Sequence, residues 1–145
     1  MKHISIIILL FFSLGFVGRG LSQCDSNQIS EASIKEIPND YTFLKTFKID
    51  GQGGSREKVE YSYVFSKNTN YSINISALGA EGSNTDGIIV SMYDAKRHQV
   101  ATNFVDGNIY SGFQYPCSAT GIYYITFTFQ NSTNYCGGCA LGFKR

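Results

Sequence analysis

Tryptophan is absent from the sequence, whereas 11 phenylalanines and 10 tyrosines are spread over its 145 residues. Phenylalanine and tyrosine favour β-strands over helices, so the aromatic content indicates a β protein. Aromatic rings supply stacking surface for sugars and anchors for protein partners. The missing tryptophan therefore weakens a glycan-binding function more than a contact with a protein or with matrix.

A large excess of charge of one sign is also lacking. The whole chain has a net charge of +1, and the part after residue 23 holds ten basic and eleven acidic side chains, a net charge of −1. The basic residues are scattered, and the adjacent trio Lys96, Arg97 and His98 is typical of a solvated turn. This distribution predicts that the protein has no nucleic-acid partner.

Helical periodicity is missing as well. No window of twelve residues carries a convincing helical stripe of apolar side chains, and there is neither an internal repeat nor a low-complexity tract. A parallel sheet needs crossover helices, and the sequence contains no segments to form them. An antiparallel sheet is the remaining architecture for the strand-forming residues.

Candidates for catalysis are few. His98 is the one histidine after residue 23, and no Gly-x-Ser-x-Gly motif or other nucleophile signature surrounds it. A serine or cysteine nucleophile needs a nearby base, and His98 is more typical of an exposed turn residue. The sequence therefore predicts no enzyme and no cofactor. A hydrolase is the disfavoured alternative, which loss of an activity in a His98→Ala protein would revive.

The first 23 residues have the layout of a secretory signal peptide. A basic Lys2 is followed by an apolar run from Ile4 to Val17 and a short stretch that ends at Gln23. About 14 apolar residues are fewer than the ~20 that span a bilayer, which disfavours a membrane anchor. We expect cleavage near Gln23 and a secreted protein.

Cys24 follows that cleavage site directly, as the acylated cysteine of a bacterial lipoprotein does. The preceding Leu21, Ser22 and Gln23 match a lipobox only in part, because the motif has Gly, Ala or Ser at the position of Gln23. If Cys24 is lipidated, the protein is periplasmic or associated with the outer membrane, and lipidation is its one expected link to a membrane. Otherwise Cys24 is a disulfide partner.

The remainder divides into a polar lead-in at 24–40, which we expect to be extended with a short helical turn as the alternative, and a β domain at 41–145. From residue 41 onward, about eight short runs of strand-forming residues are separated by clusters rich in Gly, Asn, Asp and Ser. The alternation of apolar and polar residues is clearest over 59–65, 71–77, 88–92 and 123–129, and weaker runs lie at 41–49, 98–105, 109–115 and 139–143.

A period of two places one face of each strand in the core and the other in water. Sheets with a single apolar face need a cover, and two stacked antiparallel sheets provide it for each other. We therefore expect an all-β, antiparallel two-sheet sandwich of about eight strands, preceded by a signal peptide.

Three segments of the chain resemble a known family. Residues 61–78 (YSYVFSKNTNYSINISAL), 86–103 (DGIIVSMYDAKRHQVATN) and 117–129 (CSATGIYYITFTF) are similar to the bacterial pre-peptidase C-terminal domain, and the similarity extends over roughly 57–144. The resemblance implies a jelly-roll-like sandwich with an accessory role in adhesion, substrate contact or stability of an envelope component. The family usually accompanies an enzyme and does not usually carry the cysteine cluster at 136–139.

Cys24, Cys117, Cys136 and Cys139 are an even set in a chain that we expect to be exported, which predicts disulfides. Four cysteines allow three connectivities. A bridge from Cys117 to Cys136 requires a short or bent strand between them, because a straight strand over 121–130 would hold them about 30 Å apart. We lean towards Cys136–Cys139 across a Gly137–Gly138 hairpin turn, with Cys24–Cys117 as the second bridge unless Cys24 is lipidated.

The Cys136-x-x-Cys139 motif has two alternative interpretations. A redox site requires its first cysteine at the start of a helix. Two glycines within a strand-like segment disfavour such a helix here. A zinc site requires four ligands, so Cys136 and Cys139 would have to bind zinc together with Cys117 and either Cys24 or His98. A small thiol- or metal-binding module therefore stands as the alternative to structural disulfides.

Two further sets of residues complete the predicted sites. Tyr93, Tyr110 and Tyr124 are expected to point outward and to form a binding face for a protein, matrix or glycan partner. Turn oxygens of Asp86, Asp94 and Asp106 offer a weaker calcium site, although no DxDxDG loop is present. The favoured hypothesis is a secreted or cell-envelope, non-catalytic binding or structural module whose partner the sequence does not name.

Overall fold

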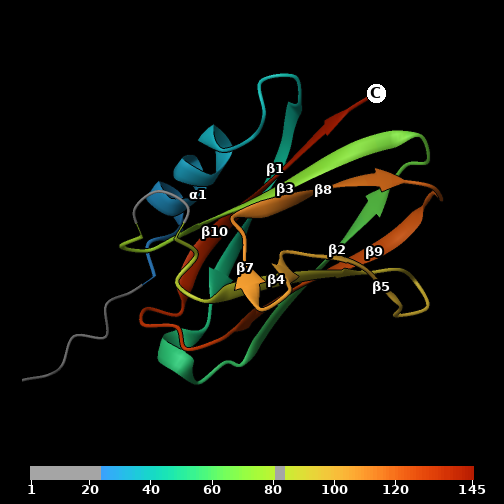
Figure 1. Cartoon of the computed structure of the whole chain (residues 1–145). Coiled ribbons are helices and arrows are strands. Elements are labelled where there is room, and N and C mark those ends of the chain that lie inside the picture. Colours follow the sequence, from blue (N-terminus) through green and yellow to red (C-terminus); the bar gives the residue numbers. More distant parts are fainter. Residues whose placement is uncertain (1–23, 81–83) are drawn as a thin grey trace, which may run out of the picture.

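A computed structural model describes residues 24–80 and 84–145 of the chain, and the predicted leader lies outside the described residues. Two four-stranded antiparallel sheets pack face to face, with a short two-stranded hairpin beside them (Figure 1). The predicted antiparallel two-sheet sandwich is confirmed. Within the described ranges, no helix is both long and apolar enough to cross a bilayer.

The strand order is that of an eight-stranded jelly roll. One sheet has the order β1-β10-β3-β8 and the other β2-β9-β4-β5, so consecutive strands mostly alternate between sheets. The strands are β1 (Thr42–Asp50), β2 (Lys58–Phe65), β3 (Thr69–Ala77), β4 (Ile88–Tyr93), β5 (Gln99–Thr102), β8 (Gly112–Cys117), β9 (Gly121–Phe129) and β10 (Cys136–Lys144). A 3-10 turn, η1 (Gln52–Gly54), joins β1 to β2.

The core lies between the two sheets, where the alternation of the sequence places it. Every second residue of β3, β4 and β9 is buried against the opposite sheet, as predicted. Phe65 is fully buried, and its ring stacks on Tyr71 and Tyr123 with centroids 4.0 Å and 5.1 Å away. The core side chains of these three strands are Tyr71, Ile73, Ile75, Ala77, Ile88, Val90, Met92, Tyr123, Ile125 and Phe127.

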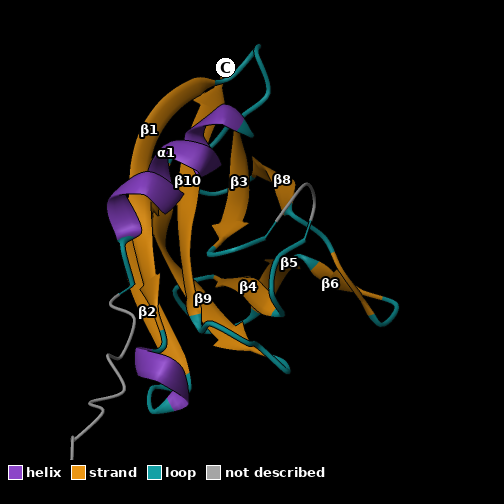
Figure 2. Cartoon of the chain, turned by 90° about the vertical axis from the view of Figure 1, so that its left-hand side faces the viewer, coloured by secondary structure: helices purple, strands orange, loops and turns teal. Residues whose placement is uncertain are grey.

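The predicted extended lead-in is wrong, because its first part is a helix, α1 (Ser26–Lys35), that covers the outer face of the first sheet (Figure 2). The Asp25 side chain caps the helix by accepting a hydrogen bond from the backbone N–H of Asn27. Ile29 and Ser33, one turn apart, are buried. The segment is too polar to show an apolar stripe, and contact with the sheet holds it in a helix.

The predicted hairpin turn at Gly137–Gly138 is also wrong, because β10 runs straight through both glycines and pairs with β1 and β3. Gly138 lies under α1, where a Cβ atom would come within 2.9 Å of the Ser30 backbone nitrogen. Glycine is used here for the close approach of a helix to a strand and not for a reversal of the chain.

The hairpin between β5 and β8 consists of β6 (Phe104–Val105) and β7 (Asn108–Ile109). Its turn residues Asp106 and Gly107 have φ values of 50° and 80°. Two positive φ angles in a two-residue loop match the twist of the flanking strands, and Asp-Gly is a favoured sequence for such a loop. In Figure 2 the hairpin extends beyond the two sheets at the right-hand side.

Candidate interaction site

Two of the three predicted contact tyrosines lie side by side on the outer face of the β2-β9-β4-β5 sheet. Tyr93 of β4 is directly opposite Tyr124 of β9, and both are half-buried. Arg97, in the turn after β4, places its guanidinium carbon 3.5 Å from the centroid of the Tyr124 ring. A cation above an aromatic ring is attracted by the negative face of that ring.

The same guanidinium group forms an ion pair across the sheet. Nη1 of Arg97 lies 2.9 Å from Oε2 of Glu60, and the hydroxyl of Thr126 donates to the same oxygen at 2.9 Å. The hydrogen bond from Arg97 is the largest cause of the lowered pKa of Glu60, and partial burial opposes it without reversing the shift. The ion pair and hydrogen bonds therefore satisfy the polar groups at the centre of this face.

Beside Arg97 the surface has a shallow depression of about 220 Å³, lined by Lys58, Glu60, Tyr93, Arg97, Thr126 and Thr128. The arrangement limits what this face can bind. Sugar recognition by stacking needs an open aromatic ring face, and the guanidinium already covers one face of the Tyr124 ring. On that face of the Tyr124 ring, the guanidinium group takes the place that a stacked sugar would need.

The turn after β4 is organised by Asp94. Its carboxylate accepts hydrogen bonds from the backbone N–H groups of His98 and Lys96 at 2.9 Å and 2.8 Å. The hydrogen bond from the His98 backbone is the largest cause of the lowered pKa of Asp94. His98 is exposed, and in the part of the chain that the structure describes its ring makes one hydrogen-bond contact, with Asp94. The turn is therefore a loop that the Asp94 carboxylate caps.

The three turn aspartates that were considered for calcium do not lie together. Asp86 and Asp94 flank opposite ends of β4, and Asp106 lies at the tip of the hairpin. Asp86 accepts hydrogen bonds from the backbones of Thr133 and Asn134, which ties two loops together. Among residues 24–80 and 84–145, no group of three or more His, Cys, Asp or Glu side chains is placed to hold a metal ion.

The third tyrosine, Tyr110, lies at the base of the β6–β7 hairpin and is 53% exposed, away from the sheet face of Tyr93 and Tyr124. Phe104 and Val105 on the same hairpin are also exposed, and this one segment supplies half of the exposed large hydrophobic residues in the described ranges. Those six residues are Phe43, Val64, Phe104, Val105, Tyr110 and Ile122.

A single buried side chain holds the base of this hairpin. Asn103 is 1% exposed, and its amide nitrogen donates to the carbonyl oxygens of Ile88 and Tyr110 at 3.2 Å and 2.8 Å. Its amide oxygen accepts from the backbone N–H of Val90 at 2.8 Å. The backbone of Asn103 adds hydrogen bonds to both Val90 and Tyr110. The hairpin is thus fixed to β4, while Phe104, Val105 and Tyr110 keep 37%, 47% and 53% of their surface exposed.

The sequence predicts Tyr110 on a contact face, but it does not predict the exposed apolar pair Phe104–Val105 or the Asn103 anchor. The predicted run at 98–105 ends within this hairpin. The available signal was the Asp-Gly dipeptide, which predicts a two-residue hairpin and therefore a separate pair of strands.

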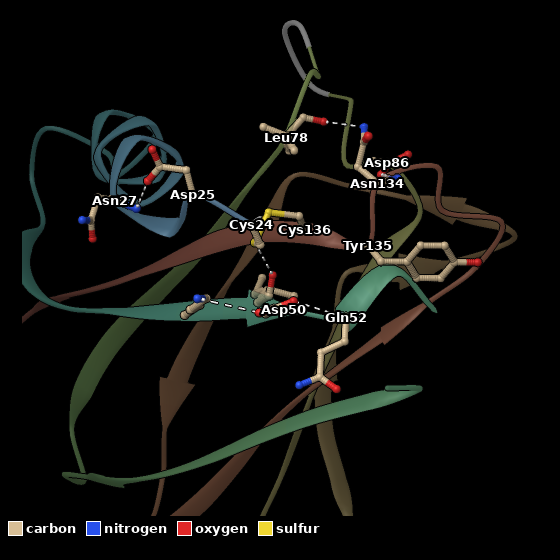
Figure 3. The surroundings of a disulfide bond; sticks show 12 residues. Cys24, Asp25, Asn27, Asp50, Gln52, Leu78, Asp86, Asn134, Tyr135 and Cys136 are labelled. Atoms are coloured by element: carbon tan, nitrogen blue, oxygen red, sulfur yellow. Dashed lines mark hydrogen bonds and ion pairs between the residues drawn. A yellow bond between two sulfur atoms is a disulfide. The ribbon is translucent and has the colours of Figure 1, made fainter. Parts of the chain in front are cut away.

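The cysteine pairing also differs from the prediction. Cys24, just before α1, is joined to Cys136 at the start of β10 (Figure 3). Cys117 and Cys139 are free and buried. Cys136 and Cys139 are three residues apart on one strand, so their side chains point to opposite faces and cannot bridge. The Cys24–Cys136 disulfide uses the sulfur atom that lipidation would need.

The two free thiols do not form a redox or zinc site. Burial raises the pKa of the Cys139 thiol, which keeps it protonated and unreactive. Cys117 donates to the carbonyl oxygen of Ala119 and lies 3.7 Å from the hydroxyl of Tyr123 in the core. The predicted thiol- or metal-binding alternative is therefore wrong: Cys136 is in a disulfide and Cys139 is enclosed.

No protein-family model matches the chain, and no curated protein sequence matches it. Among solved structures, it is similar to Aeromonas hydrophila PliG, a periplasmic lysozyme inhibitor of g-type lysozyme, with 14% identity and a TM-score of 0.45 over 72% of this chain and 87% of that chain. It is also similar to the pre-peptidase C-terminal domain of a collagenase from Bacillus anthracis, with 17% identity and a TM-score of 0.42 over 72% of this chain and 89% of that chain. The resemblance to that domain is confirmed as a weak one.

Proposed function

We propose that this protein is an exported, non-catalytic module that contacts a protein partner through its β6–β7 hairpin, residues 103–110. The observation that carries the proposal is the exposure of Phe104, Val105 and Tyr110 on a hairpin that its buried Asn103 holds in place. Partly exposed apolar side chains that gather on one segment are typical of interaction surfaces.

Rigidity supports a binding role for the hairpin. A loop that is ordered before binding loses less conformational entropy when it meets its partner. The Asp106–Gly107 turn and the Asn103 anchor both restrict the hairpin. An aromatic residue at the base and a phenylalanine on β6 supply the kind of anchor that dominates the energy of protein interfaces.

A protein partner is favoured over a glycan. On the outer face of the β2-β9-β4-β5 sheet, Arg97 covers one face of the Tyr124 ring. The hairpin instead offers a mixed set of aliphatic and aromatic side chains, which fits an apolar recess on a protein better than the face of a sugar ring.

The experiment that tests this proposal is site-specific photo-crosslinking in the cells that produce the protein. A benzophenone amino acid replaces Val105, and a matched variant carries it at Lys35, an exposed residue at the end of α1. The proposal predicts a crosslinked protein with Val105 and not with Lys35, identified by mass spectrometry. Crosslinking of the same partner at Lys35 alone, or at neither position, would overturn it.

A further inference from the structure

The sandwich is closed along only part of the side on which β1 and β2 run next to each other (Figure 2). Near the start of β2, the Tyr61 hydroxyl donates to the carbonyl oxygen of Lys48 at 2.7 Å, and the rings of Tyr61 and Phe47 lie 5.1 Å apart. Further along β2, a depression of about 190 Å³ opens instead. Its lining comes from β1, β3 and β10 of one sheet and from β2 of the other.

An irregularity of β1 gives this depression one of its apolar walls. The register of β1 against β10 shifts between Phe43 and Lys45, so Leu44 is an extra residue in the strand. Such a bulge re-aims a side chain, and Leu44 lines the depression. Tyr63 of β2 and Phe143 of β10 line it too, and all three side chains are partly buried against the core. The depression therefore has apolar walls from both sheets.

Two hydroxyl groups lie among these walls. Thr69 of β3 is 4% exposed, and within the described structure its hydroxyl forms no hydrogen bond. Because no fully buried polar side-chain atom in the described ranges lacks a partner, this hydroxyl opens into the depression. The Tyr71 hydroxyl accepts a hydrogen bond from the backbone N–H of Ser66 at 2.9 Å and has its own proton to donate. Both groups can therefore donate to an oxygen atom of a ligand.

The charge of the lining is positive. Among the described residues that line the depression, Arg145 is the one with a charged side chain, and it takes part in none of the described ion pairs. The neighbouring Asp40 is already paired with Lys144. Lys45, next to Leu44, adds a second cation, which lies 5.5 Å from the centroid of the Phe47 ring. A guanidinium group matches a carboxylate with two parallel N–H donors.

We propose that this depression binds a small carboxylate that has an apolar body. The carboxylate group pairs with the Arg145 guanidinium and accepts hydrogen bonds from the Thr69 and Tyr71 hydroxyls. The apolar body lies against Leu44 and Phe143. A few polar groups among apolar walls are typical of small-molecule sites. The site is separate from the hairpin, so it goes beyond the proposed function.

Size and chemistry narrow the class of ligand. A volume of about 190 Å³ equals that of about six water molecules at ~30 Å³ each, which limits the ligand to a single ring or a short chain. A cationic ligand would find no carboxylate among the described lining residues. A small inorganic anion would leave the apolar walls uncovered. A monoanion with an apolar body satisfies both parts of the lining.

An NMR titration of the isotope-labelled full chain with phenylacetate tests the proposal. The expected result is a saturable shift of the backbone amides of Ser66, Thr69 and Phe143, with a dissociation constant of about 0.1–1 mM, as befits a small ligand in an open site. The hairpin at 103–110 should not shift. Phenylacetamide has the same shape without the charge, and acetate has the charge without the apolar body. Each should bind at least about tenfold more weakly than phenylacetate.

Two variants at exposed cations separate a site from general attraction of anions. Arg145→Gln should weaken phenylacetate binding about tenfold, because it removes a charge-assisted hydrogen bond. Lys96→Gln is the matched control, since Lys96 is exposed in the turn after β4 and does not line this depression. This control should bind phenylacetate as the unmodified protein does. Thr69→Val should weaken binding about threefold, and if it fails to fold, Arg145→Gln decides alone.

Three results would overturn the proposal. The first is the absence of saturable shifts at these residues up to about 10 mM phenylacetate, well above the expected dissociation constant. The second is equal binding of phenylacetate and phenylacetamide. The third is an equal loss of affinity in Arg145→Gln and Lys96→Gln. Crosslinking through the hairpin is measured separately, so this proposal and the proposed function can fail independently.

Discussion

At the scale of single residues, Asn103 combines full burial of a polar side chain with three side-chain hydrogen bonds to backbone groups of β4 and the hairpin. An alanine at this position removes all three bonds and leaves buried backbone groups without partners. The residue therefore links the stability of the sandwich to the position of the contact hairpin.

We predict that Asn103→Ala lowers the free energy of unfolding by about 2 kcal/mol, as expected when buried polar groups lose their partners. Asn108→Ala is the matched control, because its amide makes one exposed hydrogen bond to Asp106 and should change stability by less than about 0.5 kcal/mol. Urea denaturation measures both. Equal effects in the two variants would show that Asn103 does not anchor the hairpin.

Asp86 makes stability depend on pH. Partial burial acts to raise its pKa, but hydrogen bonds from Thr133, Asn134 and Ser132 outweigh burial and leave the pKa below its ordinary value. A carboxyl group with a lowered folded-state pKa stabilises the protein above its unfolded pKa, and this contribution is lost as the pH falls through the folded pKa.

The unmodified protein should therefore lose stability below about pH 4, the ordinary range of an aspartate pKa. Asp86→Asn, which cannot ionise, should be less stable at neutral pH and should show a smaller loss on acidification. Thermal unfolding at a series of pH values measures the difference between the two curves. Parallel curves across that range would contradict the role assigned to the Asp86 carboxylate.

The disulfide gives a third prediction at this scale. Cys24–Cys136 closes a loop with a sequence separation of 112, and its removal by Cys24→Ser should cost about 2–4 kcal/mol of stability. A reducing agent should destabilise the unmodified protein and leave the Cys24→Ser protein unchanged. Alkylation of the denatured, unreduced chain should label Cys117 and Cys139, the two free thiols. Labelling of no cysteine would contradict this pairing.

At the scale of elements, α1 and β10 fit together because Gly138 has no side chain. A Cβ atom there would meet the Ser30 backbone at 2.9 Å and 3.0 Å, and backbone cannot move as a flexible side chain does. Gly138→Ala should therefore push the helix from the sheet, at a cost of about 1–3 kcal/mol. Gly121→Ala on β9 is the control, since nothing lies within 4 Å of its Cβ position. A Gly138→Ala protein as stable as the Gly121→Ala protein would contradict close packing of α1.

The same elements show which part of the fold could be predicted from the sequence. Strands such as β3 and β9 carry their alternation in consecutive residues, so their buried faces were predicted correctly. The helix α1 could not be predicted in this way, because its stability comes from contact with β10, which lies more than a hundred residues later in the chain. Gly137 and Gly138 were read as a turn because glycine favours both turns and close approaches.

The candidate site was predicted in part. Tyr93 and Tyr124 do lie on an outer strand face, but a sequence does not show that Arg97, four residues beyond β4, folds back over the Tyr124 ring. The separation of Tyr110 from that pair depends on the crossover from one sheet to the other. The cysteine pairing likewise depends on how strands far apart in sequence align, and pairing rules based on spacing do not contain this information.

At the scale of the whole molecule, the described structure presents three different outer surfaces. The helix α1 covers the outer face of the first sheet, and the hairpin projects from the sandwich (Figures 1 and 2). The outer face of the second sheet carries the Arg97–Glu60 ion pair. The hairpin has partly exposed apolar side chains. Of these three surfaces, the hairpin is the one that we propose as the partner contact.

Titration calorimetry with the crosslinked partner, once purified, tests the assignment of partner contact most directly. Val105→Asp on the hairpin and Tyr124→Ala on the sheet face form the decisive pair, both checked for native stability. Loss of an apolar interface anchor typically weakens binding by about 2 kcal/mol, or ~30-fold, and we predict this loss for Val105→Asp and unchanged affinity for Tyr124→Ala. Unchanged affinity in Val105→Asp, with the loss in Tyr124→Ala instead, would contradict it.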